Sequence, residues 1–149
     1  MNSLKIFNTK IYKPMSPKIR AVLGVLAGMV SGTIVIGGIE MFNPLGVPAG
    51  TVLETNEQLE AYMKTLPFTA FLPLLVALFL GAGVAGFVAN WICKPTKYRP
   101  AMIAGLGLFV AGVMNLIAIP HPLWFSIVSS LLTLLGAWAG GKAVGRTAN

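Results

Sequence analysis

The residues of this chain that could do chemistry are few, and they gather toward one end of its apolar segments. Asn115 lies within the third apolar run, among small residues that place it on an inward face. His121 stands between two prolines in the turn after that run, and histidine ordinarily titrates near neutral pH. Glu40 ends the first run at the same membrane level. The fourth run adds hydroxyl groups: Ser126, Ser129, Ser130 and Thr133.

Each of these polar residues has a structural and a functional interpretation. Asn115 either forms an interhelical hydrogen bond to a hydroxyl of the fourth run, worth about 0.6–2 kcal/mol, or contacts a ligand or ion. His121 either caps the turn or acts as a proton sensor or ligand contact. Glu40 and His121 lie at the same depth in the membrane and can carry opposite charges, which predicts a contact between them. All seven polar residues are therefore candidates for a ligand or ion site.

Motifs of known catalytic chemistry are missing from the sequence. It has no GxSxG, HExxH, Walker or CxxC pattern. One cysteine and one histidine exclude an internal disulfide and a zinc site of conventional ligand count. No apolar run carries a charge near its middle, which argues against a proton-coupled pump. We therefore predict a non-enzymatic protein without a metal or cofactor.

The elements that must position the candidate residues are membrane-spanning helices. Of 149 residues, 56% are hydrophobic and 10% are charged, where a soluble domain usually has about 25% charged residues. Each of four apolar runs is long enough to cross a bilayer as a helix. The sequence predicts an all-α integral membrane four-helix bundle that forms one transmembrane domain over residues 1–149. Its spans are 21–39, 68–92, 101–119 and 123–139.

Charge is sorted between the two sides of the predicted bundle. All four acidic residues lie in the segment 40–67, whereas most basic residues precede the first run, follow the fourth, or join the second to the third. Basic loops stay on the cytoplasmic side. We expect both termini in the cytoplasm and the acidic loop 40–67 outside the plasma (inner) membrane. The net charge of +7 then indicates anionic lipid headgroups on the cytoplasmic side as partners, and no nucleic acid.

The acidic loop also contains a predicted short helix over residues 56–65. Thr55 and Gln58 form a capping box at its start, and Pro67 follows its end. Apolar residues recur through it at the spacing of one helical face. We expect this amphipathic helix to lie on the outer surface of the bundle, where it covers helix ends or docks a partner.

Small residues at four-residue spacing predict close helix packing in all four spans. Leu-Gly-Ala occurs in both the second and the fourth span, at residues 80–82 and 135–137, which raises the possibility of a duplicated hairpin. Some of the small-residue stripes could instead form a homo-oligomer interface. The glycines assigned to helix packing are Gly24, Gly28, Gly32, Gly81, Gly86, Gly112, Gly136 and Gly140.

The region around the last turn also resembles a known family. Asn115 followed by Ile-Pro-His-Pro-Leu-Trp-Phe at residues 119–125 resembles a family of small four-span bacterial membrane proteins. The second span over 81–90 looks similar too, and the resemblance covers residues 20–142. It implies four spans and an outer-side element that contains Asn115 and His121. It implies no activity.

Three functions remain open at this point. The first is a structural or accessory membrane protein that self-associates or serves a membrane complex, as the small-residue stripes indicate. The second is a small channel or transporter, with a polar path around Asn115 and the fourth-span hydroxyls and an outer mouth at Glu40 and His121. The third is binding of a lipid or other apolar ligand between the helices.

Overall fold

The computed structural model describes residues 15–42, 54–94 and 99–147. Over these residues the fold is all-α. In chain order the helices are α1 (Pro17–Glu40), α2 (Asn56–Thr65), α3 (Phe68–Cys93), α4 (Arg99–Ala118) and α5 (Leu123–Thr147). All except α2 are long and apolar enough to cross a membrane, by length and composition. The predicted all-α four-helix bundle is confirmed, and the chain is a multi-pass membrane protein.

Some helix ends differ from the limits of the apolar runs. α1 begins at Pro17, because proline suits the first turn of a helix, where its missing N–H has no intrahelical partner. α5 continues to Thr147, since helix formation does not require apolar residues. α4 stops short of Pro120, whose ring disfavours helical geometry at the preceding residue. Residues 43–53 and 95–98 of the predicted loops lie outside the described residues.

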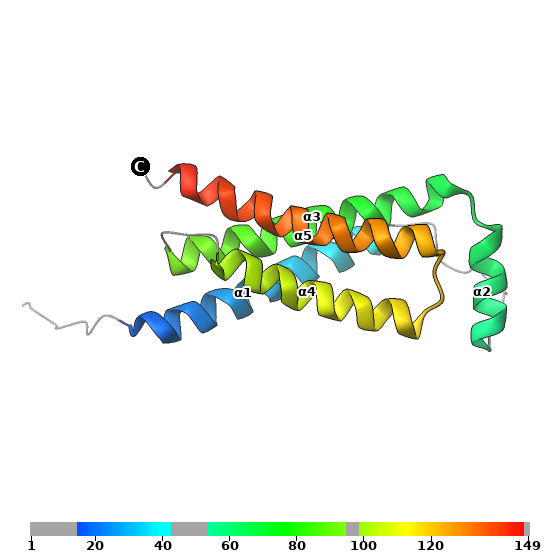
Figure 1. Ribbon diagram of the computed structural model, residues 1–149, viewed down its shortest axis with the longest axis horizontal. Helices are drawn as coiled ribbons and strands as arrows, with labels where there is room; N and C mark the ends of the chain where they lie inside the picture. Colours follow the sequence, from blue (N-terminus) through cyan, green and yellow to red (C-terminus); the bar gives the residue numbers. More distant parts are fainter. Residues whose placement is uncertain (1–14, 43–53, 95–98, 148–149) are drawn as a thin grey trace, which may run out of the picture.

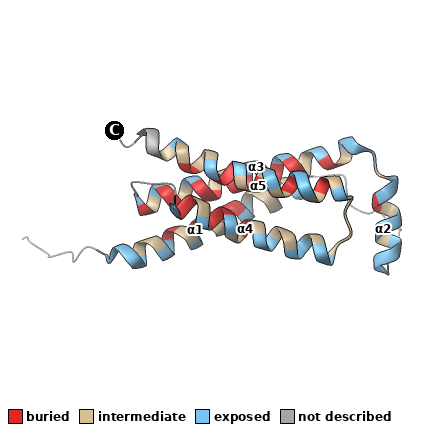
Figure 2. Ribbon diagram, in the orientation of Figure 1, coloured by how far each residue is buried: buried red, intermediate tan, exposed pale blue. Residues whose placement is uncertain are grey.

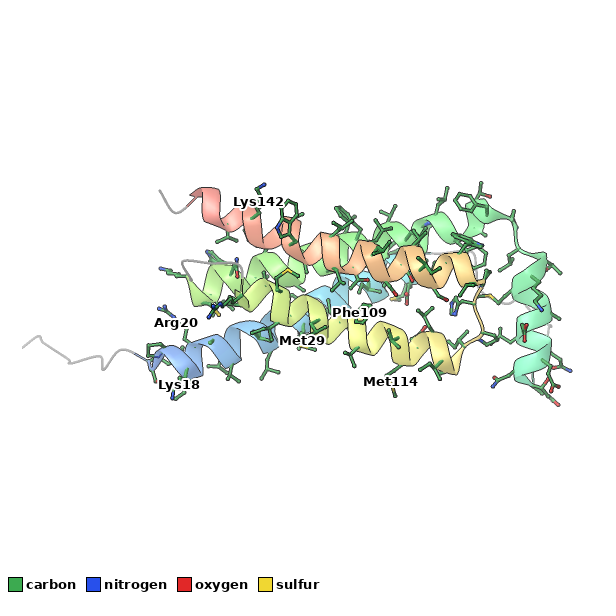
Figure 3. All side chains as sticks on the ribbon, viewed as in Figure 1. Lys18, Arg20, Met29, Phe109, Met114 and Lys142 are labelled. Atoms are coloured by element: carbon green, nitrogen blue, oxygen red, sulfur yellow. The ribbon has the colours of Figure 1, made fainter. Side chains whose placement is uncertain are left out.

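Charge distinguishes the two ends of the bundle. The start of α1, the end of α3, the start of α4 and the end of α5 lie at one end, and Figure 3 shows basic side chains there. α2 and the turn from α4 to α5 lie at the opposite end, where α2 runs across the bundle (Figure 1). The first is called the basic end, after Lys18, Arg20, Lys94, Arg99 and Lys142. The second is called the acidic end, after Glu40, Glu54, Glu57 and Glu60.

Close backbone contact holds the basic half of the bundle together. α1 lies on α3 along the buried residues Gly24, Gly28 and Gly32. A β-carbon added to Gly28 would lie 2.5 Å from the Ala85 carbonyl oxygen, so only glycine lets the two backbones approach this closely. Four other predicted packing glycines are similarly crowded by neighbouring helices: Gly81, Gly86, Gly136 and Gly140.

Gly112 differs from the other predicted packing glycines. A β-carbon added there would meet no heavy atom of the described residues within 4 Å. The prediction that Gly112 packs against a neighbouring helix is therefore wrong. The physical reason is that Gly112 lines the cavity between the helices and does not face a neighbouring backbone.

Polar contacts tie the helix ends together near the basic end. The Asn90 side chain donates a hydrogen bond to the carbonyl of Gly141 in α5, at 3.0 Å, and accepts one from the backbone N–H of Ala101 in α4, at 3.0 Å. The Arg20 guanidinium donates to the carbonyl of Cys93, at 2.9 Å. These bonds join all four long helices, because a polar group within a bilayer must find its partner inside the protein.

α1 and α4 diverge toward the acidic end. The buried residues of α1 end at Gly32 and those of α4 end at Leu108, so the last third of α1 and the second half of α4 have none. Figure 2 shows the same change, with buried positions on α4 confined to the half toward the basic end. Figure 1 shows the two helices spreading apart beyond that level. The divergence leaves space inside the acidic half of the bundle.

An aromatic cluster fills the other side of the acidic half. Its buried members are Met63 of α2, Phe71 and Leu75 of α3, and Phe125 of α5. The rings of Phe71 and Phe125 lie 5.4 Å apart between centroids, and Trp124 contacts both. α2 is thereby attached to the bundle through Met63, while most of its other residues are exposed.

The start of α2 has the hydrogen bonds expected of a capped helix. Thr55 Oγ1 accepts a hydrogen bond from the backbone N–H of Gln58 at 3.3 Å. The Gln58 side-chain oxygen accepts from the backbone N–H of Glu54 at 2.8 Å, one residue earlier than a standard capping box. α2 therefore covers the residues over which the sequence predicts it.

The possible duplicated hairpin stays a prediction. A two-fold relation between the halves would pair α1 with α4 and α3 with α5. Among the described residues α3 contacts α4, but the equivalent pair, α1 and α5, makes no contact. Any internal symmetry is therefore partial in the arrangement of the helices.

Candidate functional site

A cavity of about 290 Å³ occupies the space between the diverging helices in the acidic half. Residues of α1, α3, α4, α5 and the turn between α4 and α5 form its wall. Its polar side chains come from three helices and the turn, whereas α3 contributes only leucines. The lining residues that carry the argument are Thr33, Glu40, Asn115, His121, Ser129, Ser130 and Thr133.

Six of the seven candidate residues from the sequence line this one cavity. Only Ser126 does not line it, because its hydroxyl lies against the Pro122 carbonyl, 3.5 Å away, at the start of α5. Glu40 comes from the last turn of α1, and Asn115 from the last turn of α4. The divergence of α1 and α4 therefore brings together residues that are far apart in the chain.

His121 is held by the turn in a single orientation. Its Nδ1 lies 2.7 Å from the carbonyl oxygen of Ile119. A carbonyl oxygen only accepts hydrogen bonds, so Nδ1 carries the hydrogen and donates it. In the neutral ring, Nε2 is then an acceptor. The ring also stacks on Phe125, with centroids 5.1 Å apart and an interplanar angle of 17°.

The hydroxyl groups of α5 present acceptors to the cavity. Ser130 Oγ donates to the Ser126 carbonyl at 2.7 Å, and Thr133 Oγ1 donates to the Ser129 carbonyl at 2.8 Å. Ser129 Oγ likewise donates to the Ser126 carbonyl, at 3.2 Å. Each hydroxyl has one hydrogen, which its own helix already uses. Only the lone pairs of these oxygens remain for a ligand.

Asn115 does not make the predicted interhelical hydrogen bond. Its side chain is exposed, lines the cavity and has no hydrogen bond to any described residue. The predicted partners in α5 donate to their own backbone instead, and Asn115 faces the cavity that it shares with them. The Asn115 amide therefore offers both donors and an acceptor to a ligand.

Glu40 and His121 line the same cavity without forming an ion pair. Within the described residues the ion pair within 4.0 Å joins Lys64 and Glu60 of α2, not these two side chains. The predicted contact is therefore wrong, because the cavity separates the end of α1 from the turn, and His121 bonds to Ile119 instead.

Comparisons with known proteins identify no family for this chain. No family model matches it, and no curated protein or solved structure matches it at a significant level. The resemblance based on Asn115 and residues 119–125 stays a prediction. The chemistry of the cavity is therefore the basis for any functional proposal.

Thr33 and Gly37 belong to the cavity wall but were not among the candidates from the sequence. They share a face of α1 with Glu40, at helical spacings of four and seven residues from Thr33. A β-carbon added to Gly37 would meet no heavy atom of the described residues within 4 Å, so this glycine widens the cavity. Both residues could have been predicted from the sequence, because helical spacing places them on the same face as Glu40.

The cavity is apolar toward the basic end and toward α3. Leu74, Leu78, Leu108 and Phe109 supply this part of the wall. Figure 3 shows Phe109 near the middle of the bundle, while Met114, on the same helix, points away from it. Below Leu108 the helices close against one another through buried alanines. The site is thus polar near the acidic end and closed and apolar at its other end.

A second depression lies between α3 and α5, on the side facing away from this cavity. Its volume is about 320 Å³, and its lining has no polar side chain: Phe79, Leu80, Gly83, Val84, Phe87, Gly136, Ala139 and Gly140. In the described part of the chain it offers no group for chemistry or for specific recognition.

No metal site accompanies the cavity. No group of three or more His, Cys, Asp or Glu side chains that could hold a metal ion occurs among the described residues. Glu40 and His121 are the ionisable side chains in the lining. The arrangement can accept hydrogen bonds from a small polar group beside an apolar wall.

Proposed function

We propose that this protein is a non-enzymatic membrane protein that binds a lipid between its helices, with the lipid's polar head in the cavity of the acidic half. The observation that carries the proposal is the cavity itself, in which a polar rim of Glu40, Asn115 and His121 lies above an apolar wall. Ligand pockets typically combine a mostly apolar wall with a few polar groups that fix orientation.

The divergence of α1 and α4 supports a lipid as the ligand. The parts of both helices beside the cavity have no buried residues, and their outward side chains are largely apolar, such as Ile34 and Met114. In a bilayer the seam between these helices faces lipid. A volume of about 290 Å³ lies at the lower end of the ~300–1,000 Å³ range of ligand pockets, which suits a head group but not the chains. The acyl chains would remain along the seam.

The closed basic half favours binding over conduction. A channel needs a polar path from one end of the bundle to the other. The deepest polar side chains of the cavity are Thr33 and Thr133, and the space beyond them is filled by Ala85, Ala89 and Ala104. Conduction would require these closely packed helices to separate. We therefore prefer a bound lipid to a channel or transporter.

Two neighbouring glycines of α1 provide a matched test. Gly37 lines the cavity and Gly38 does not, and a β-carbon at either position meets no heavy atom of the described residues within 4 Å. Gly37→Leu should fill the cavity, whereas Gly38→Leu should add the same side chain outside it. Both variants should unfold at or above the wild-type temperature, since leucine favours helix over glycine.

Lipid retention is the measurement for this pair. Each protein is transferred from nanodiscs of equal parts phosphatidylethanolamine, phosphatidylcholine and phosphatidylglycerol into mild detergent, and retained lipid is counted by native mass spectrometry. We expect the wild type and Gly38→Leu to keep one lipid and Gly37→Leu to lose it. Equal retention by the two variants, or no lipid on the wild type, would refute the proposal.

The orientation is a proposal that follows from charge. Positive residues are retained in the cytoplasm, so we place the basic end inside and the acidic end, with the cavity mouth, outside the plasma (inner) membrane. Lys18 and Lys94 are exposed at the basic end and are suited to anionic headgroups there. In a Cys93→Ala background, Glu57→Cys should react with an impermeant maleimide on intact cells and Lys142→Cys should not. The reverse labelling pattern would overturn this orientation.

A further inference from the structure

We infer that the head group bound in this cavity carries a primary ammonium group, which Glu40, Asn115 and His121 receive together. The inference rests on the proposed lipid-binding function and adds the chemical class of the ligand. It follows from the charges in the cavity wall, the unused acceptors at its rim and the number of hydrogens that an ammonium group donates.

The charge of the wall selects against anionic head groups. Glu40 contributes a carboxylate, and none of the described lining residues is a lysine or arginine. Arg20, Lys94 and Arg99 lie at the opposite end of their helices. A phosphatidylglycerol head would meet a like charge with no cation to offset it, whereas an ammonium would meet an opposite charge.

Unused hydrogen-bond acceptors are concentrated at the rim. The Glu40 carboxylate has no ion-pair partner among the described residues, and the Asn115 amide oxygen has no hydrogen bond there. His121 donates from Nδ1 to Ile119, which leaves Nε2 of the neutral ring as an acceptor. These groups come from three separate elements: the end of α1, the end of α4 and the turn before α5.

Donors are scarce in the same wall. The hydroxyls of Ser129, Ser130 and Thr133 donate to their own helix, so they too face the cavity as acceptors. The remaining donors are the Asn115 amide and the Thr33 hydroxyl, neither of which has a hydrogen bond to another described residue. Leaving many acceptors without donors in an apolar site costs free energy, so the best ligand is rich in N–H groups.

A primary ammonium supplies three N–H donors, one for each acceptor at the rim. A trimethylated ammonium has the same charge but no N–H, and it binds best inside a cage of aromatic rings. Here Phe125 and Phe109 are the aromatic residues in the lining, and Phe125 is already stacked on His121. The wall therefore distinguishes an ethanolamine head from a choline head, which carries the same charge.

Competition between lipids tests the inference. Wild-type protein is placed in nanodiscs with equal amounts of phosphatidylethanolamine and phosphatidylcholine of identical chains. It should retain roughly tenfold or more ethanolamine lipid than choline lipid, because one charge-assisted hydrogen bond is worth about that factor. Glu40→Gln keeps the side-chain size and removes the charge, and the preference should fall to within about twofold. Glu60→Gln is the matched control, because Glu60 is exposed on α2 and does not line the cavity.

The outcomes separate this inference from the proposed function. If Gly37→Leu abolishes retention but wild type and Glu40→Gln show the same lipid preference, lipid binding stands and the ammonium assignment is wrong. If Gly37→Leu and Gly38→Leu retain equal lipid, the proposed function itself fails. Soluble glycerophosphoethanolamine is added as a competitor. If this competitor displaces the lipid at a concentration comparable to that of the lipid, the site recognises an ammonium group, but its ligand is not a membrane lipid.

Discussion

The side-chain amide of Asn90 in α3 donates a hydrogen bond to the carbonyl of Gly141 in α5, across 3.0 Å. The amide oxygen of Asn90 also accepts from the Ala101 N–H in the first turn of α4, a group with no intrahelical partner. With 3% of its surface exposed, Asn90 is among the most buried polar residues described. This one side chain therefore links three helices near the basic end.

Replacing this asparagine should destabilise the bundle, and replacing the other intramembrane asparagine should not. Asn90→Leu leaves a buried N–H without a partner and should lower the free energy of unfolding by about 1–3 kcal/mol. Asn115→Leu removes no hydrogen bond to a described residue and should change it by about 0.5 kcal/mol or less. Denaturation in mixed detergent micelles measures both, and equal losses would contradict the assignment.

A single methyl group added at the contact between Gly28 and Ala85 should lower the free energy of unfolding. Gly28→Ala places a β-carbon 2.5 Å from the Ala85 carbonyl oxygen, so α1 must move away from α3. We expect a loss of about 1–3 kcal/mol, which exceeds the gain of up to about 1 kcal/mol in helix propensity. Gly38→Ala is the control, since its β-carbon meets nothing within 4 Å among the described residues, and it should be neutral or stabilising.

The cap of α2 should govern the local stability of that helix alone. Thr55→Ala removes the acceptor for the Gln58 N–H and should cost about 0.5–2 kcal/mol within α2. Hydrogen exchange of the α2 amides should then accelerate by roughly 2- to 30-fold, while exchange in α3 stays unchanged. Glu60→Ala removes only the exposed ion pair with Lys64 and should have little effect. Unchanged or slower exchange after Thr55→Ala would show that the cap is not needed.

The general architecture was predictable because it depends on composition and on the bilayer. The length of the apolar runs predicts four membrane spans. Each span must be a helix, because a helix satisfies its own backbone hydrogen bonds inside the bilayer. The capping residues Thr55 and Gln58 similarly made α2 predictable, because a cap acts between neighbouring residues. Features of this kind require no knowledge of how the helices cross.

The partners of individual polar side chains were not predictable, because they depend on how the helices cross. Asn90 and Asn115 both lie beside small residues on their helices, and the sequence allowed Asn115 either an interhelical hydrogen bond or a ligand contact. The structure gives such a bond to Asn90, because α4 contacts α3 near Ala101, whereas Gly112 and Asn115 face the cavity. The crossing of α1 and α4 decides this, and it depends on contacts between distant parts of the chain.

The last prediction separates the two nitrogens of His121. Asparagine can place an amide N–H where Nδ1 lies, so His121→Asn should keep the hydrogen bond to the Ile119 carbonyl, whereas His121→Leu cannot. We expect the free energy of unfolding of His121→Asn to lie within about 0.5 kcal/mol of the wild-type value, and that of His121→Leu to be lower by about 0.5–1.5 kcal/mol. Both variants remove the Nε2 acceptor from the cavity, so both should weaken the preference for phosphatidylethanolamine over phosphatidylcholine in the nanodisc competition. If His121→Asn instead keeps the full preference, the histidine serves the turn alone, and Glu40 and Asn115 are the residues that bind the head group.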